Sequence, residues 1–190
     1  MTQSMTTQNP LPPSAIIREV GLRDGLQSIA RVLPTAQKIE WIRDAHAAGQ
    51  REIEVGSFVP ARLLPQLADT AELVAFAKTL PGMTVSVLVP NLKGAERAME
   101  CQADLMLLPL SVSHAHSLAN MRRTPDEVVA DIERIVEARN ASGSKTLIEV
   151  GMSTAFGCTL QGRVLFDEAA SPVSCALDPR VDLPILADTV

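Results

Sequence analysis

The chain has 190 residues, of which 46% are hydrophobic and only 3% are aromatic, so its core must be built mainly from aliphatic side chains. This length is sufficient for one domain with a core of its own. The formal net charge is −5 and no basic block occurs, which argues against nucleic acid as a partner. No apolar run approaches the roughly 20 residues that span a bilayer, so we expect no membrane partner either.

The first 14 residues are polar and lack both the charged and the apolar part of a signal peptide. We interpret them as a disordered N-terminal tail. The three cysteines, Cys101, Cys158 and Cys175, are widely spaced and odd in number, which fits a reducing cytoplasm better than a disulfide framework. Nothing close to Cys158 in the sequence lowers its pKa, and we interpret it as a small buried residue.

Predicted strands and helices alternate along the chain. Apolar runs predict six strands at residues 15–20, 51–56, 84–89, 104–110, 145–152 and 183–187. Helical patterns occupy the intervals at residues 35–48, 65–79, 93–102 and 124–139, and a weaker helix after Gly162 is interrupted by Pro172 and Pro179. Such an alternation is typical of a parallel α/β sheet.

Two of the helices have clear start signals. Thr35 is predicted to cap the first helix, and Gly49 to end it. The fourth begins with Thr124, Pro125 and two acids, which combine a cap, a proline at the first helical position and negative charge in the first turn. The segment between the fourth strand and this helix is expected to be a loop.

The stretch directly after the first strand carries an adjacent Arg23 and Asp24 between Gly21 and Gly25. Arginine offers a rigid fork of donors for a carboxylate or an enolate-like oxygen. Aspartate is a hard oxygen ligand for a divalent cation such as Mg²⁺ or Mn²⁺. Taken alone, the pair is better interpreted as a surface ion pair on a turn, since such pairs are common and contribute little to stability.

Polar residues recur where the other predicted strands end. They are Glu54, Ser57, Asn91, Ser111, Ser113, Ser153, Thr154, Asp188 and Thr189. In a β/α barrel the carboxyl ends of the strands share one face, and the active site lies there. No glycine-rich dinucleotide turn or phosphate-binding loop follows any strand, which argues against a nucleotide-binding doubly wound sheet. The pattern therefore indicates a barrel with a polar, metal-capable face.

Several stretches, in order and in register, resemble the family of hydroxymethylglutaryl-CoA lyases. They are residues 19–27 (Glu-Val-Gly-Leu-Arg-Asp-Gly-Leu-Gln), 53–60 (Ile-Glu-Val-Gly-Ser-Phe-Val-Pro), 64–69, 89–94, 113–117, 156–158 and 186–189. The resemblance runs from about residue 16 to residue 190. It implies a TIM-type (β/α) barrel, of which residues 15–190 would form an incomplete lyase-like domain with about six of the eight strand–helix units.

The resemblance also implies an activity. The family cleaves a carbon–carbon bond of a 3-hydroxy-3-methylglutaryl-CoA-type substrate to give acetyl-CoA and a keto acid, acetoacetate, usually in leucine breakdown, with Mg²⁺ or Mn²⁺ as cofactor. By similarity Asp24 would be a metal ligand, Arg23 would stabilise the enolate, and Glu54 would hold Arg23. Residues that would bind the acyl-CoA substrate are Gln27, Ser57, Asn91, Asp188 and Thr189.

The sequence departs from the family after the sixth strand. A whole barrel takes about 250 residues and eight strands. The family's His-x-His metal ligands, glycine-rich loop with a reactive cysteine, and asparagine ligand have no counterpart here, so the chain reads as truncated. His114 and His116 follow the fourth strand, and we interpret them as loop residues that touch substrate or solvent rather than as the missing ligands.

Three interpretations remain open at this point. The chain is a metal-dependent lyase whose site is completed by a homo-oligomer or another chain. Alternatively it is a non-catalytic, truncated family member. The third interpretation, an α/β binding protein unrelated to the lyases, has to treat all of the ordered motifs as coincidence.

Overall fold

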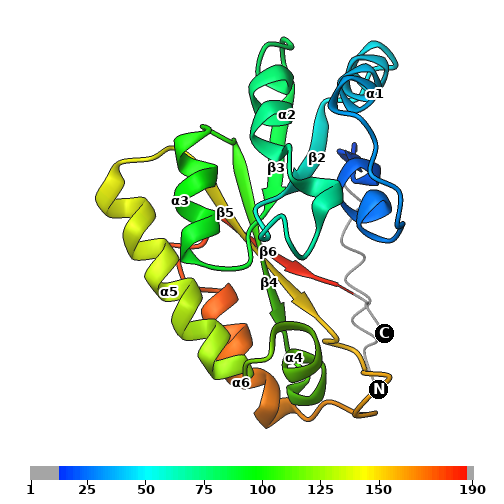
Figure 1. Ribbon diagram of the computed structural model, residues 1–190. Coiled ribbons are helices and arrows are strands. Elements are labelled where there is room, and N and C mark those ends of the chain that lie inside the picture. Colours follow the sequence, from blue (N-terminus) through cyan, green and yellow to red (C-terminus); the bar gives the residue numbers. More distant parts are fainter. Residues whose placement is uncertain (1–12, 188–190) are drawn as a thin grey trace, which may run out of the picture.

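The structure is a computed structural model that describes residues 13–187, apart from the side chains of Phe166 and Glu168. Six parallel strands pair in chain order to form one sheet. The strands are β1 (Arg18–Glu19), β2 (Glu52–Ser57), β3 (Thr84–Leu88), β4 (Leu105–Ser111), β5 (Leu147–Ser153) and β6 (Leu183–Leu186). Figure 1 shows the sheet curling into part of a barrel with helices along one side of it. The predicted partial TIM-type (β/α) barrel is therefore confirmed. Most of the predicted tail at residues 1–14 lies outside the described residues.

The helices follow the predicted alternation, with one addition. They are α1 (Thr35–Ala47), α2 (Thr70–Ala77), α3 (Leu92–Glu100), α4 (His114–Met121), α5 (Pro125–Ser142) and α6 (Phe166–Ala176). A π-helical turn, η1 (Gly21–Gly25), follows β1, and a 3₁₀ turn, η2 (Pro65–Leu67), precedes α2. No helix among the described residues is long and apolar enough to cross a membrane.

The loop predicted after β4 is wrong, because that segment forms α4. Its start is set locally, since the Ser113 side chain accepts a hydrogen bond from the backbone N–H of His116 at 3.2 Å. At eight residues the helix is too short for a repeating apolar stripe to show in the sequence.

Two further predictions about helices need correction. Pro34, not Thr35, is the N-cap residue of α1, and the Thr35 hydroxyl instead donates to Asp69 at 2.8 Å. Pro172 does not interrupt the sixth helix but lies inside it. The start predicted for α5 is confirmed, because Thr124 and Glu127 form a reciprocal capping box.

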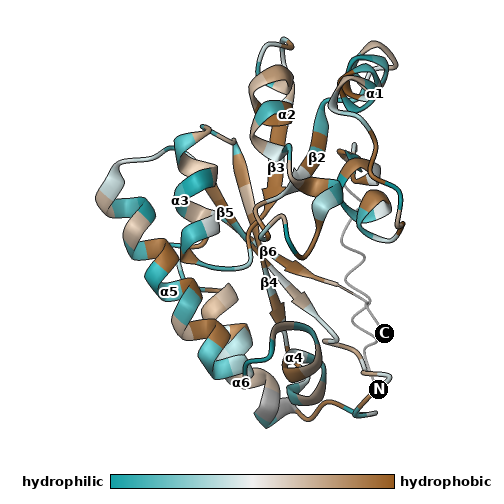
Figure 2. Cartoon of the chain, viewed as in Figure 1, coloured by the Kyte–Doolittle hydropathy of each residue, from teal (hydrophilic) through white to brown (hydrophobic). Residues whose placement is uncertain are grey.

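The two faces of the sheet differ in chemistry. On β5 the side chains of Ile148, Val150 and Met152 are buried beneath the helices, whereas Glu149 and Ser153 belong to the opposite, inner face. Figure 2 shows the strands mostly brown and the outer helices striped with teal. The apolar core thus lies between sheet and helices, and polar residues are left on the inside of the curve.

Candidate active site

A cavity of about 890 Å³ lies against the inner face of the sheet, near the carboxyl ends of the strands. Its lining includes five of the eight residues predicted to be catalytic, metal-binding or substrate-binding, namely Arg23, Asp24, Gln27, Glu54 and Asn91. A second cavity, of about 690 Å³, lies at the opposite ends of the strands beside Lys78 and Asp104 and contains none of them. The first cavity is therefore the candidate active site.

The η1 turn places Arg23 and Asp24 at this cavity. The backbone N–H groups of both residues donate to the Val20 carbonyl, at 3.1 and 2.8 Å. Glycine is required at the start of the turn, because a Cβ at Gly21 would lie 2.7 Å from both the Trp41 ring and the Glu19 carboxylate. The turn is therefore packed tightly against α1, which fixes the backbone that carries the arginine.

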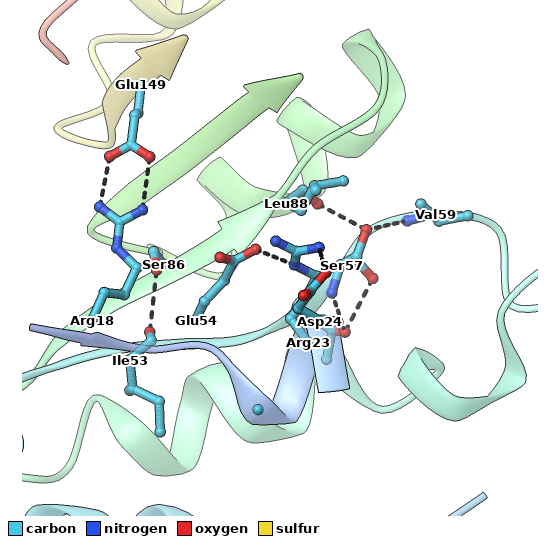
Figure 3. Close-up of polar contacts among 12 residues, drawn as sticks. Arg18, Arg23, Asp24, Ile53, Glu54, Ser57, Val59, Ser86, Leu88 and Glu149 are labelled. Carbon is cyan, nitrogen blue, oxygen red and sulfur yellow. Dashed lines mark hydrogen bonds and ion pairs between the residues drawn. The ribbon is translucent and has the colours of Figure 1, made fainter. Parts of the chain in front are cut away.

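Arg23 joins two carboxylates. Its Nε donates to Glu54 Oε1 at 2.5 Å and its Nη1 donates to Asp24 Oδ1 at 2.8 Å, as Figure 3 shows. Burial raises the pKa of Glu54 above its ordinary value, and the positive charge of Arg23 acts in the opposite direction. Within the described part of the chain the Nη2 group of Arg23 has no hydrogen-bond partner. The guanidinium is thus held on one side and keeps donors for a ligand.

A second ion-pair network lies deeper on the inner face and was not predicted. Arg18 on β1 donates to Glu52 at 2.6 Å, and its two Nη groups donate to the two oxygens of Glu149 on β5 at 2.7 and 2.6 Å. The hydrogen bonds to Glu149 raise the pKa of Arg18 above the ordinary value for arginine. The one sequence signal was Glu149 itself, a charged residue inside the apolar run of β5.

The predicted substrate-binding residues are placed differently from one another. Gln27 is exposed at the cavity, and Asn91 caps α3 by accepting a hydrogen bond from Gly94 N at 3.0 Å. Ser57 is buried outside the cavity lining, where its hydroxyl donates to the Leu88 carbonyl at 3.1 Å (Figure 3). Its substrate contact therefore stays a prediction. Asp188 and Thr189 lie outside the described residues.

The residues described here do not by themselves form a metal site. No group of three or more histidine, cysteine, aspartate or glutamate side chains suited to a metal ion occurs among them. The Asp24 side chain is 62% exposed and one of its oxygens is bonded to Arg23. His116 lines the cavity, whereas His114 is exposed outside it.

The three cysteines are free thiols in distinct surroundings. Cys158 is buried as predicted, but the expectation of an ordinary pKa is wrong. A hydrogen bond from Ser113 Oγ, at 3.1 Å, and backbone N–H groups nearby lower the pKa of the Cys158 thiol. Burial instead raises the pKa of Cys175 to about 11. Ser113 comes from α4's cap, so no local signal could have indicated this contact.

Comparison with known proteins decides the family. The sequence pattern of the family described as HMGL-like matches residues 14–190. The chain belongs to the HMGL-like family.

Relatives of this HMGL-like chain include lyases. It is 33% identical over 180 residues to the mitochondrial hydroxymethylglutaryl-CoA lyase of Arabidopsis thaliana, covering 95% of this chain and 38% of that protein. It is 36% identical over 155 residues to the 3-hydroxy-3-isohexenylglutaryl-CoA/hydroxymethylglutaryl-CoA lyase of Pseudomonas aeruginosa, covering 81% and 51%. The chain spans about half the length of the curated relatives it matches.

Solved structures of HMG-CoA lyases are similar to this chain in fold. An HMG-CoA lyase from Acinetobacter baumannii, in complex with coenzyme A and 3-methylmalate, superposes with a TM-score of 0.83 at 36% identity, covering 92% of this chain and 56% of that one. The lyase from Brucella melitensis gives a TM-score of 0.80 at 33% identity, covering 93% and 62%.

Proposed function

We propose that this chain carries the site at which a hydroxymethylglutaryl-CoA lyase splits 3-hydroxy-3-methylglutaryl-CoA into acetyl-CoA and acetoacetate. The observation that carries the proposal is Arg23, which Glu54 and Asp24 hold at the cavity while its Nη2 donors stay unpaired within the described residues. Membership of the HMGL-like family and the similarity to named lyases support it.

The chemistry needs an anion-stabilising group. The 3-hydroxyl of the substrate loses its proton and becomes the ketone of acetoacetate as the bond between C2 and C3 breaks. The electron pair of that bond passes to the acetyl thioester as an enolate, which takes up a proton to become acetyl-CoA, so the step needs no oxidant or reductant. Arg23 would donate hydrogen bonds to the enolate oxygen. A preorganised donor of this kind contributes about 3 kcal/mol to stabilising a transition state.

A divalent ion, Mg²⁺ or Mn²⁺, belongs to the proposal as cofactor, with Asp24 as one ligand. Because the described residues offer no group of three ligands, we assign no reaction step to the ion. Further ligands would come from residues outside the described range, from a second copy or from another chain. A Mn²⁺ titration by calorimetry tests this. Micromolar one-to-one binding that Asp24→Ala removes supports it, and no binding below millimolar Mn²⁺ contradicts it.

The alternative is a family member that binds an acyl-CoA without cleaving it. One observation favours this alternative, which is that Asp24 stands without further metal ligands in the described part of the chain. For either function we propose a cytoplasmic location. The cytoplasmic lyase of Rattus norvegicus, 33% identical over 163 residues, is one relative with that location in its name, although others are mitochondrial.

The test is an assay of acetoacetate release from hydroxymethylglutaryl-CoA with Mg²⁺ or Mn²⁺ present. We expect cleavage by the wild-type chain and a loss of about 100-fold or more in Arg23→Gln. Arg31→Gln, which changes an exposed arginine, is the matched control and should keep full activity. Full activity in a folded Arg23→Gln variant would overturn the mechanism. Binding of coenzyme A without any cleavage by the wild type would favour the alternative.

A further inference from the structure

One hydrogen-bonded group at the cavity has no role in the proposed chemistry. Ser111 and Ser153 pair in register at the ends of β4 and β5, and their hydroxyl oxygens lie 3.2 Å apart. Ser111 Oγ also lies 2.8 Å from Nδ1 of His116, in the first turn of α4. Both His116 and Ser153 line the cavity. Two strands and a helix thus converge on one imidazole ring.

The contacts give Ser111 and His116 different roles. Ser111 is only 2% exposed and is not part of the cavity lining, so it acts as an anchor for the ring and cannot reach a ligand as a nucleophile. The Nε2 atom of His116 has no hydrogen-bond partner within residues 13–187. A neutral imidazole carries one N–H and one acceptor nitrogen, and a hydroxyl can serve either. When Ser111 donates to Nδ1, the proton lies on Nε2, which is then a free donor.

The position of the ring suits a ligand that spans the cavity. Asn120, one helical turn after His116, also lines the cavity, so one face of α4 supplies both polar groups. Arg23 and Glu54 line the same cavity from another part of the sheet, nearer its first edge, on η1 and β2. Between the two polar sides lie apolar side chains of β3 and β4, among them Leu88 and Leu107.

We propose that His116 is a ligand-binding residue of this cavity, whose Nε2–H donates to an oxygen of the acyl-CoA ligand while Ser111 aims the ring. The class of ligand rests on the proposed function. The acceptor oxygen belongs either to the carboxylate of the hydroxy acid or to the coenzyme A portion, and separate titrations distinguish these sources.

The experiment compares two amides that each retain one half of the imidazole. In His116→Gln the side-chain amide reaches the position of Nε2, whereas in His116→Asn it reaches only that of Nδ1. Each variant of the 190-residue chain is titrated by calorimetry with 3-methylmalate and, separately, with coenzyme A. His114→Gln, which changes an exposed histidine on the same helix, is the control. We expect His116→Asn to weaken binding of one probe about three- to tenfold, the loss of one hydrogen bond. His116→Gln should stay within about twofold of wild type.

A purely structural role predicts the reverse, since Asn would keep the bond to Ser111 and Gln would lose it. Weaker binding by His116→Gln than by His116→Asn would therefore overturn the proposal. So would unchanged binding of both probes in both variants, or a wild-type chain that binds neither probe. Ring ¹⁵N resonances give a second readout, because the chain has only three histidines to assign. Ligand should shift Nε2 of His116 and leave His114 unchanged. These experiments measure binding and not cleavage. A chain that binds the probes but does not cleave hydroxymethylglutaryl-CoA would contradict the proposed function, while the titrations would still test the contact with His116.

Discussion

Arg23 and Glu54 are 31 positions apart in the sequence, yet the guanidinium Nε donates to the carboxylate at 2.5 Å. The Glu54 side chain is 1% exposed, and the Arg23 side chain is 14% exposed. The buried carboxylate of Glu54 therefore fixes the orientation of the Arg23 guanidinium, which lines the cavity. Burial raises the pKa of Glu54, which makes this acid easier to protonate than an ordinary glutamate.

The raised pKa of Glu54 predicts a pH-dependent difference in stability. Between about pH 4.3, the ordinary value for glutamate, and its raised folded value, the folded state binds more protons than the unfolded state. The Glu54 contribution to the free energy of unfolding therefore falls as pH rises through this window. We expect Glu54→Gln to gain stability relative to wild type over that range, as measured by urea unfolding. Glu137→Gln, at an exposed position, should show no such trend, and parallel curves for Glu54→Gln and wild type would refute the prediction.

The two-bond contact between Arg18 and Glu149 predicts a large loss of stability on removal of one partner. Arg18→Met leaves the Glu149 carboxylate, 1% exposed, without its partner, at a cost of about 3 kcal/mol in the free energy of unfolding. The double variant with Glu149→Gln should recover at least half of this loss. Arg134→Met, which breaks an exposed pair with Asp131, should change stability by less than about 0.5 kcal/mol. Equal effects of the two single variants in urea unfolding would contradict the prediction.

Lys38 is a buried lysine that anchors α1. Its Nζ donates to the Gln66 carbonyl and to Asp69, both at 2.6 Å, and the residue is 1% exposed. We expect Lys38→Met to lower the free energy of unfolding by about 2 kcal/mol, because both acceptors lose a charged donor. Lys93→Met, at an exposed lysine, is the control. Thermal unfolding of both variants measures the difference, and a Lys38→Met midpoint equal to that of wild type would rule out the anchor.

Gly56 is required on β2 for steric reasons. A Cβ there would lie 2.3 Å from the Thr70 hydroxyl, which is itself bonded to the backbone of Ser57. We expect Gly56→Ala to cost about 2 kcal/mol in unfolding free energy. Gly157→Ala, with nothing within 4 Å of the added carbon, should cost less than about 0.5 kcal/mol. Urea unfolding that gives both variants the same stability would show that Thr70 moves aside freely.

The sheet was predictable because its signals are local. Strands β3 to β6 lie in the predicted apolar runs, and the predicted start of α5 is confirmed, since Thr124 and Glu127 cap it with two hydrogen bonds, at 3.2 and 2.7 Å. The helix α4 was not predictable, because one capping serine and a single pair of turns leave no periodic pattern. Thr35 resembled a cap, but its hydroxyl is taken by Asp69, 34 positions away.

The site was predictable only in part. Arg23 and Asn91 follow strands and Glu54 lies on one, and because the carboxyl ends of these strands share one face in a barrel, topology brings all three to the cavity. Ser57 is an exception, because it is buried outside the cavity lining and its hydroxyl is bonded to the Leu88 carbonyl. The pairing of Arg18 with Glu149 joins residues 131 positions apart, and no local pattern specifies a partner at that separation.

That separation has a consequence for when the protein can finish folding. Backbone pairing holds β1 to β2 over only two residues, Arg18 and Glu19, and the ion pairs of Arg18 with Glu52 and Glu149 add to the attachment of this first strand. During synthesis the amino-terminal segment emerges first, but Arg18 lacks a principal partner until residue 149 has left the ribosome. Arg23, on η1 directly after β1, differs in this respect, because its partners Asp24 and Glu54 lie at most 31 positions away. The first strand of the sheet therefore completes its side-chain contacts only after residues of the fifth strand are available.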